Sequence, residues 1–280
     1  MAAILRQPRK NDIVCSSVYT SEPGERGECN MKILALVFAA RRDETSKTLQ
    51  MTKELCGMIG RRCEDAAFEI LTMSELPVQA CVGCKTCFLE GFCPQDGEDG
   101  MAELRRKVID CDALIAATPV YMCSVSGWCK IFLDRCARWC HVFELLGKPG
   151  LVLSVTGASG AERAADYLSE CLEVMGCAVA ARLPLQKLGE GLVIGGEEAR
   201  TAMESAAEAL LDAVEHPEQY LSERAETQFR GIRQNYRSLE TFRLLMGQSC
   251  SDEINTFRER GLMGCASLRE ALQKKGKTES

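Results

Sequence analysis

The sequence predicts a doubly wound α/β domain, in which helices cover both faces of a parallel sheet, followed by a helical extension. Two observations carry this prediction. Five short, almost uninterrupted apolar runs are typical of strands buried on both faces, and segments of helical periodicity separate them. Strands that alternate with helices pair in parallel through crossover connections, and five such strands suit the spatial order 2-1-3-4-5. The expected strands are residues 32–38, 68–71, 113–117, 151–155 and 178–183.

Helical patterns fill the intervals between these strands. In the first, Leu49, Leu55 and Met58 recur at roughly helical spacing. A later pattern ends at Gly176, a residue type that commonly terminates helices. The expected helices are residues 46–60, 101–109, 126–143, 161–176 and 197–214.

The pattern divides the chain into three regions. Residues 1–30 lack periodicity and predict a flexible N-terminal tail, and residues 31–215 form the α/β domain. In residues 216–280 the strands stop, and an apolar stripe predicts an amphipathic helix, followed by shorter helices over 251–260 and 266–275. We expect this extension to pack on its own domain or on a partner subunit. The stripe consists of Phe229, Ile232, Tyr236, Leu239, Phe242 and Met246.

Charge and hydropathy exclude several classes of protein. The net charge of −6 is opposite to that of a nucleic-acid-binding face, and no apolar run reaches the length of a membrane span. The N-terminus MAAILRQPRK lacks the sustained apolar segment of a secretory signal. We therefore expect a cytoplasmic protein whose 17 cysteines are free thiols, metal ligands or redox groups.

Four cysteines stand together in residues 81–93, which read CVGCKTCFLEGFC. Cysteines at these offsets arise by chance with a probability of only about 0.4% for this composition. Four thiolates from one loop can bind a four-iron cluster or a tetrahedral zinc ion. Structural zinc sites usually pair two knuckles well apart, so this compact spacing suits an iron–sulfur cluster better; free thiols without metal are the third alternative. The candidate ligands are Cys81, Cys84, Cys87 and Cys93.

Three loops are expected to meet at the carboxyl edge of the sheet, where open parallel sheets bind ligands. The first, residues 38–48, leads into a helix N-terminus and carries an arginine and three hydroxyl groups. This combination suits a phosphate, although the hydroxyls could equally serve as helix caps. The polar residues are Arg41, Thr45, Ser46 and Thr48.

The other two loops suit a flat ring. Residues 118–125 begin with Pro119, which stiffens the turn, and carry Tyr121, which can stack on a ring or merely cover the sheet edge. Residues 156–160 read TGASG and are small and flexible enough for their backbone to approach a ring closely.

In these loops the chain resembles the flavodoxin-like NAD(P)H-dependent FMN reductase family and, within it, the branch called iron–sulfur flavoproteins. FAARRDETS at 38–46 corresponds to the family's GSPRxxGNT loop, and DGM at 99–101 to its acidic turn after the compact cysteine motif. TPVYMCSVSG at 118–127 matches a TPVY segment followed by Ser-x-Ser-Gly, and TGASG at 156–160 matches a TGGSG-like loop. The resemblance covers roughly residues 31–215.

The chain departs from the family in the phosphate loop. Phe38 and Glu44 replace its two glycines, and Ala39 and Ala40 replace its Ser and Pro. Asp43 adds a second acidic group near the expected phosphate. We therefore expect weaker or altered phosphate binding at this loop.

The resemblance implies a flavodoxin-like fold, bound FMN and NAD(P)H as electron donor. The phosphate would lie at the first loop, and the isoalloxazine ring against 119–124 and 156–157. Flavin chemistry belongs largely to the cofactor, so no catalytic acid or base is assigned, which suits a chain whose only histidines are His141 and His216. The expected cofactor-binding residues are Ala39, Arg41, Thr45, Ser46, Thr48, Pro119, Val120, Tyr121, Met122, Cys123, Ser124, Thr156 and Gly157.

Three functions of different classes follow. The leading hypothesis is an FMN-dependent oxidoreductase, a homodimer or homotetramer that delivers hydride or electrons to a quinone, flavin, nitro compound or protein. A 4Fe–4S cluster beside the flavin would convert an electron pair into single electrons. One alternative is an electron-transfer module fed by ferredoxin. The other is a regulatory protein without flavin, which only the altered phosphate loop supports.

Overall fold

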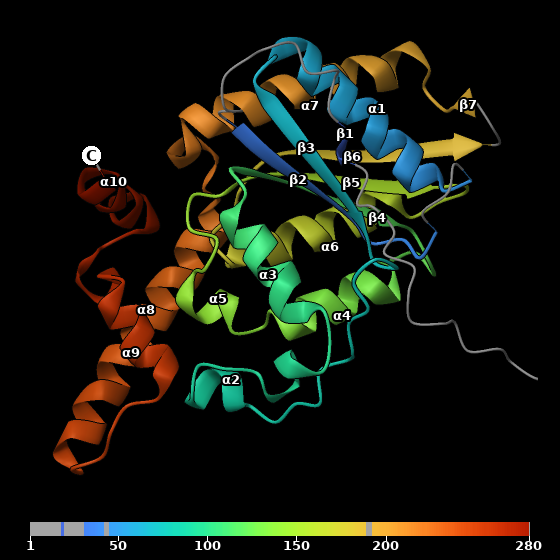
Figure 1. Ribbon diagram of the computed structural model, residues 1–280. Helices are drawn as coiled ribbons and strands as arrows, with labels where there is room; N and C mark the ends of the chain where they lie inside the picture. Colours follow the sequence, from blue (N-terminus) through green and yellow to red (C-terminus); the bar gives the residue numbers. More distant parts are fainter. Residues whose placement is uncertain (1–17, 20–30, 42–44, 189–191, 280) are drawn as a thin grey trace, which may run out of the picture.

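Five parallel strands form the centre of the sheet in this computed structural model, which describes residues 18–19, 31–41, 45–188 and 192–279 (Figure 1). Their spatial order is β3-β2-β4-β5-β6, which confirms the predicted order 2-1-3-4-5. Every neighbouring pair among them is parallel, so all five carboxyl ends lie at one edge. The strands are β2 (Met31–Val37), β3 (Ala66–Thr72), β4 (Ala113–Pro119), β5 (Pro149–Thr156) and β6 (Ala178–Leu188).

Two short antiparallel strands extend the sheet at its sides. β1 (Val18–Tyr19) pairs with β3, and β7 (Leu192–Val193) pairs with β6. Neither was predicted, because two residues are too few to show an alternating pattern. Apart from β1, the predicted tail 1–30 lies outside the described residues.

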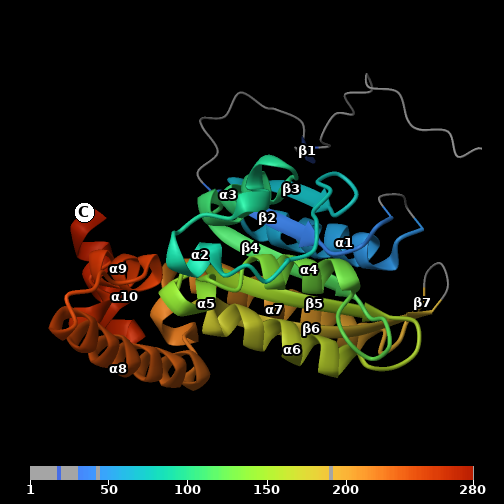
Figure 2. The ribbon, with the colours of Figure 1, turned by 90° about the horizontal axis from the view of Figure 1, so that it is seen from below.

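Helices cover both faces of the sheet (Figures 1 and 2). Successive residues of β2 point to opposite sides: Ile33 lies in the apolar cluster of α1 and α7, whereas Leu34 lies in the cluster of α3, α4 and α6. The strands are therefore buried on both faces, as their uninterrupted apolar sequences predict. The helices of these layers are α1 (Lys47–Arg62), α3 (Met101–Asp110), α4 (Gly127–Arg135), α6 (Ala161–Val174) and α7 (Glu197–Glu215).

The single helix predicted over 126–143 is wrong in extent. It ends as α4 at Arg135, and a separate short helix α5 (Trp139–Val142) follows. At the break, the N–H of Cys136 is shared between the carbonyls three and four residues before it, so the last turn tightens. Arg135 before this turn pairs with Asp99, and Arg138 after it pairs with Asp252.

The C-terminal extension is helical, as predicted, and packs on its own domain. Phe229 and Tyr236 of α8 are buried in one cluster with Phe143 of the domain, and the ring centroids of Phe143 and Phe229 lie 5.5 Å apart. The later part of the predicted stripe is exposed, as at Phe242. None of the described helices is both long and apolar enough to cross a membrane. The extension consists of α8 (Glu223–Leu245), α9 (Asp252–Glu259) and α10 (Leu268–Glu279).

Candidate functional site

Hydrogen bonds join the three predicted loops at the carboxyl edge. Ser126 Oγ donates to the carbonyl of Phe38 at 2.7 Å, which ties the second loop to the first. Val120 N–H donates to the carbonyl of Val155 at 3.0 Å, which ties the second loop to the strand that leads into the third. The loops therefore form one continuous edge.

In the first loop, the predicted phosphate ligands divide into two pairs. Arg41 and Thr45 are exposed, and Arg41 Nη1 donates to Thr45 Oγ1 at 3.3 Å. Ser46 is the N-cap of α1, and its hydroxyl accepts a bond from a first-turn N–H at 3.3 Å. Thr48 is buried within α1. The capping role therefore holds for Ser46, while Arg41 and Thr45 remain accessible to a ligand.

Phe38 and Ala39, which replace Gly and Ser of the family loop, point into the domain. Phe38 is 1% exposed, and its ring centroid lies 5.3 Å from that of Phe132. Ala39 is also buried. The bulky Phe38 therefore leaves the sheet edge open.

Lys47 is a candidate that the sequence analysis missed. Its Nζ lies 3.4 Å from the position that a Cβ on Gly157 would occupy, so its ammonium group bridges the first and third loops. Lys47 is the first residue of α1, and no acidic residue lies in that first turn. A cation at a helix N-terminus opposes the helix dipole, and this unfavourable placement is the signal that could have identified it.

The second loop is a tight turn with an unusual backbone. Tyr121 and Ser124 exchange two backbone hydrogen bonds of 3.0 Å, and Met122 and Cys123 between them have φ values of 49° and 58°. Left-handed backbone costs a residue other than glycine roughly 1–2 kcal/mol. The turn presents Met122 almost completely, at 98% exposure, together with Tyr121 at 60%. The fold thus maintains a strained, partly apolar projection at the ligand edge.

The third loop packs directly on the second. Thr156 Oγ1 donates to the carbonyl of Ser159 and accepts from Ala158 N–H, both at 3.1 Å. Gly160 has φ +90°, and a Cβ there would lie 2.8 Å from Cys123 Cα. Only glycine fits this approach between the two backbones.

The four-cysteine loop contains the short helix α2 (Thr86–Leu89) and follows β3. Cys81 and Cys84 are exposed, and Cys87 and Cys93 are half-buried. Partial burial and the neighbouring thiols of Cys93, Cys81 and Cys84 raise the pKa of Cys87. Nevertheless, no group of three or more potential ligands among the described residues is arranged to hold a metal ion.

A buried network of charged side chains anchors the four-cysteine loop to the end of helix α4. Arg135, whose side chain is fully buried, donates to Asp99 at 2.5 Å, to Asp96 at 3.2 Å and to the carbonyl of Gln79 at 3.1 Å. Although burial opposes its ionisation, the hydrogen bonds to Arg135 and to the N–H groups of Gln79 and Met101 hold the pKa of Asp99 below its usual range. Asp99 therefore anchors the acidic turn at residues 99–101 to Arg135.

Arg135 also connects this charge network electrostatically to the cysteines. Burial opposes its charge, but the bond to Asp99 and the proximity of Cys93 raise the pKa of its guanidinium. Its Nε is buried without a hydrogen-bond partner. No pattern in the sequence identifies Arg135, which occupies an ordinary position at the end of a helix.

Helix α4 connects the two regions. Ser126, its N-cap, holds the sheet edge, and Arg135, its last residue, holds the cysteine loop. A helix of nine residues is about 13 Å long. One rigid element therefore sets the separation between the carboxyl edge of the sheet and the thiols.

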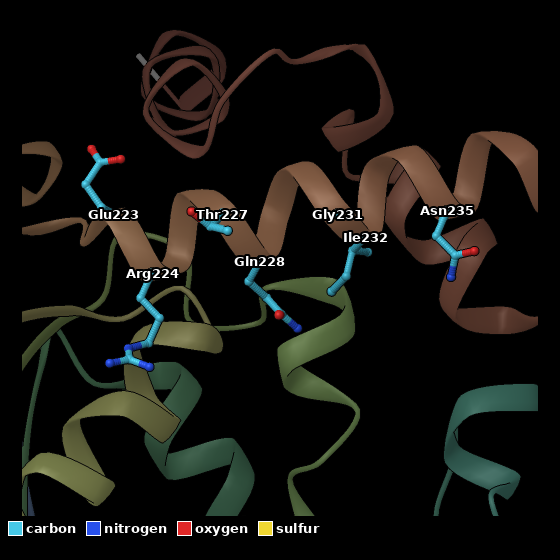
Figure 3. A pocket seen from close by; sticks show the side chains of 7 residues that line it. All are labelled: Glu223, Arg224, Thr227, Gln228, Gly231, Ile232 and Asn235. Atoms are coloured by element: carbon cyan, nitrogen blue, oxygen red, sulfur yellow. The ribbon is translucent and has the colours of Figure 1, made fainter.

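An open groove lies elsewhere, along α8 (Figure 3). Its side chains all come from that helix, and one of them, Arg224, pairs with Glu170 of α6 at 2.7 Å. The groove belongs to the extension and not to the carboxyl edge, so we assign no cofactor to it.

Comparison with known proteins places the chain among flavin enzymes. Residues 31–185, more than half of the chain, match the profile of the NADPH-dependent FMN reductase family. The chain belongs to this family.

Two curated relatives support the iron–sulfur flavoprotein branch. An iron–sulfur flavoprotein of Archaeoglobus fulgidus is 34% identical over 119 residues, which cover 41% of this chain and 53% of that protein. One of Methanocaldococcus jannaschii is 30% identical over 129 residues, which cover 46% and 63%. The match thus spans less than two thirds of either relative.

A solved structure supports the fold alone. FerB, a flavoenzyme NAD(P)H:(acceptor) oxidoreductase from Paracoccus denitrificans, is 19% identical, with a TM-score of 0.50 over 66% of this chain and 98% of that chain. The chain therefore has a flavodoxin-like fold.

Proposed function

We propose that the chain is an FMN-dependent oxidoreductase that accepts hydride from NAD(P)H and delivers hydride or electrons to an acceptor. One observation carries the proposal. Cationic groups at Arg41 and Lys47 and the projecting turn at 121–124 lie on one continuous sheet edge, and the small loop 156–160 lies next to both Lys47 and this turn. Membership of an FMN reductase family supports the same function.

In the first loop, which lacks the two glycines of the family, we expect positively charged side chains to bind the phosphate. Arg41 and Lys47 supply two cations beside the free N–H groups at the start of α1, where an anion is favoured. Thr45 adds an accessible hydroxyl. Ser46 and Thr48 are occupied in the helix, so they would contribute backbone N–H groups rather than hydroxyls.

The part of the sheet edge expected to contact the isoalloxazine ring provides packing surface rather than reactive side chains. Pro119 and Val120 lead into the turn at 121–124, whose exposed Tyr121 and Met122 would cover one face of the isoalloxazine, with Thr156 and Gly157 at its edge. Bound FMN would supply the redox chemistry, as a hydride acceptor that can release electrons in pairs or singly. The chain has to hold the ring and leave one face open, so no catalytic acid or base is assigned.

We assign a 4Fe–4S cluster to Cys81, Cys84, Cys87 and Cys93. Four thiols from one loop supply the donor set of such a cluster, and a buried guanidinium with an unpaired Nε lies close to Cys93. Cations and N–H donors near the sulfurs stabilise an anionic cluster. Cluster assembly would draw the four sulfurs closer together than they lie here. The names of the curated relatives support the assignment, and bound iron would carry electrons singly.

The proposal includes a homo-oligomer, either dimer or tetramer, and an acceptor that is a small molecule or another protein. Free thiols in this number require a reducing compartment, which supports a cytoplasmic location.

A spectrum of anaerobically purified full-length protein tests the assignment. We expect the paired flavin bands, broad cluster absorption that bleaches on reduction, and four iron atoms per chain. Steady NADPH oxidation supports the enzyme, whereas flavin reduction by reduced ferredoxin alone supports the electron-transfer module. A colourless protein that fails to take up added FMN would contradict the flavin assignment. Zinc without iron would contradict the cluster.

A further inference from the structure

The C-terminal extension touches the four-cysteine loop directly. Helix α9 lies against α2 and α5 (Figures 1 and 2). The closest approach is at Gly91, where a Cβ would lie 2.7 Å from a carboxylate oxygen of Asp252. Gly91 also has φ +83°, a backbone that favours glycine, and a methyl group there would have to displace the Asp252 carboxylate.

An ion pair fixes Asp252 in this position. Arg138 pairs with the Asp252 carboxylate and donates to Thr256 Oγ1 at 2.7 Å, while Thr256 Oγ1 and Asp252 Oδ2 are 3.2 Å apart. Arg138 stands three residues after Arg135, which binds the other side of the loop. The turn between α4 and α5 therefore holds the cysteine loop twice, directly through Arg135 and by way of α9 through Arg138.

A second contact involves the residue that follows Cys87. The Phe88 ring packs against His141 with centroids 5.0 Å apart at 66°. The imidazole is itself held, because His141 Nδ1 lies 2.9 Å from Glu253 Oε2 and 3.3 Å from the Tyr236 hydroxyl. Thus α8 and α9 both support the imidazole on which this part of the loop rests.

We propose that helix α9 positions the outer half of the cysteine loop, residues 88–91, and thereby keeps Cys87 and Cys93 in place relative to each other. Asp252, Glu253 and Arg138 are positioning residues in this arrangement. The inference rests on the proposed function only for the identity of the group that the thiols bind. Because anything bound by the loop would then also stabilise the extension, the loop and the extension form one coupled unit.

Two glycines of the same loop provide a matched test. Gly91 and Gly83 both have positive φ, at 83° and 68°, but a Cβ on Gly83 meets nothing within 4 Å. In the full-length chain without metal, we expect Gly91→Ala to increase alkylation of Cys87 by iodoacetamide at least fivefold more than Gly83→Ala does. Mass spectrometry resolves the individual cysteines. In the protein with metal, Gly91→Ala should release iron to a chelator faster by a similar factor.

A double-mutant cycle shows whether the contact with Asp252 is the cause. Asp252→Ala removes the group that a new methyl would meet, so Gly91→Ala should add little on that background. Glu204→Gln, which breaks an exposed pair with Arg200 within α7, should leave alkylation of Cys87 unchanged. Equal effects of Gly91→Ala and Gly83→Ala, or full additivity with Asp252→Ala, would overturn the proposal. Chain that retains no iron but shows the expected alkylation pattern would support the positioning role and reject the cluster alone.

Discussion

The carboxyl edge of the sheet and the four-cysteine loop are built in opposite ways. At the edge, backbone groups at neighbouring strand ends bond to one another, as between Val120 and Val155, and strand register fixes their positions. The loop leaves Val82, Leu89 and Phe92 exposed and depends on ion pairs from distant segments, such as Arg135 with Asp99. One site therefore follows from the fold, whereas the other depends on a few side chains.

The largest effect in this comparison is expected from Arg135→Met. Removal of the guanidinium leaves the buried Asp99 carboxylate without its partner, and breaking a buried pair from one side typically costs about 3–5 kcal/mol. We expect the free energy of unfolding to fall by that order and bound iron to be lost. Denaturant titration and iron analysis measure the two effects.

Arg62→Met is the matched control. It removes a pair with Glu208 at 3.1 Å whose carboxylate side chain is 66% exposed, and such surface pairs are worth about 1 kcal/mol or less. A similar loss of stability in both variants would show that the charge network does not specifically hold the loop.

Gly160→Ala tests the backbone-built edge. A Cβ there would meet Cys123 Cα at 2.8 Å, and backbone cannot move aside as a flexible side chain can. We expect a destabilisation of roughly 1–3 kcal/mol with weakened flavin binding. Gly261→Ala has the same left-handed backbone, with φ +71°, but open space around it. The difference between the two variants therefore isolates the contact between the loops, and equal losses would mean that backbone strain alone explains the effect.

Lys47→Ala separates recognition of the phosphate from that of the ring. Loss of a charge-assisted hydrogen bond, worth about 1.5–3 kcal/mol, should weaken FMN binding roughly tenfold to a hundredfold. Riboflavin, which lacks the phosphate, should bind as before. Lys53→Ala, further along α1, is the control. If riboflavin weakens as much as FMN, Lys47 does not bind the phosphate.

The same contrast explains what could be predicted from the sequence. Buried strands and the shared edge follow from local patterns, and hydroxyls before a helix identify Ser46 as a cap candidate. The strand order does not follow from these patterns; it was predicted because five such strands suit the order 2-1-3-4-5. Arg135 and Arg138 could not be assigned, because their partners Asp99 and Asp252 stand far away in the sequence. The break after α4 was missed because it carries no glycine or proline.

The smallest expected effect is a pH dependence of the contact between loop and extension. Hydrogen bonds to Cys140 and Glu253 raise the pKa of His141 from 6.5 to about 9, so the fold favours the protonated imidazole, which the Tyr236 hydroxyl also faces. Its stabilising contribution is therefore complete below pH 6.5 and is lost as the pH rises through about 9.

Because the side chain is 40% exposed, solvent screens the interaction and the effect should be modest. We expect the stability difference between the natural chain and His141→Gln to shrink between pH 6.5 and 9. A difference that stays constant across this range would mean that Phe88 rests on a neutral ring, and the support of the loop by α9 would then reside in Asp252 and Arg138 alone.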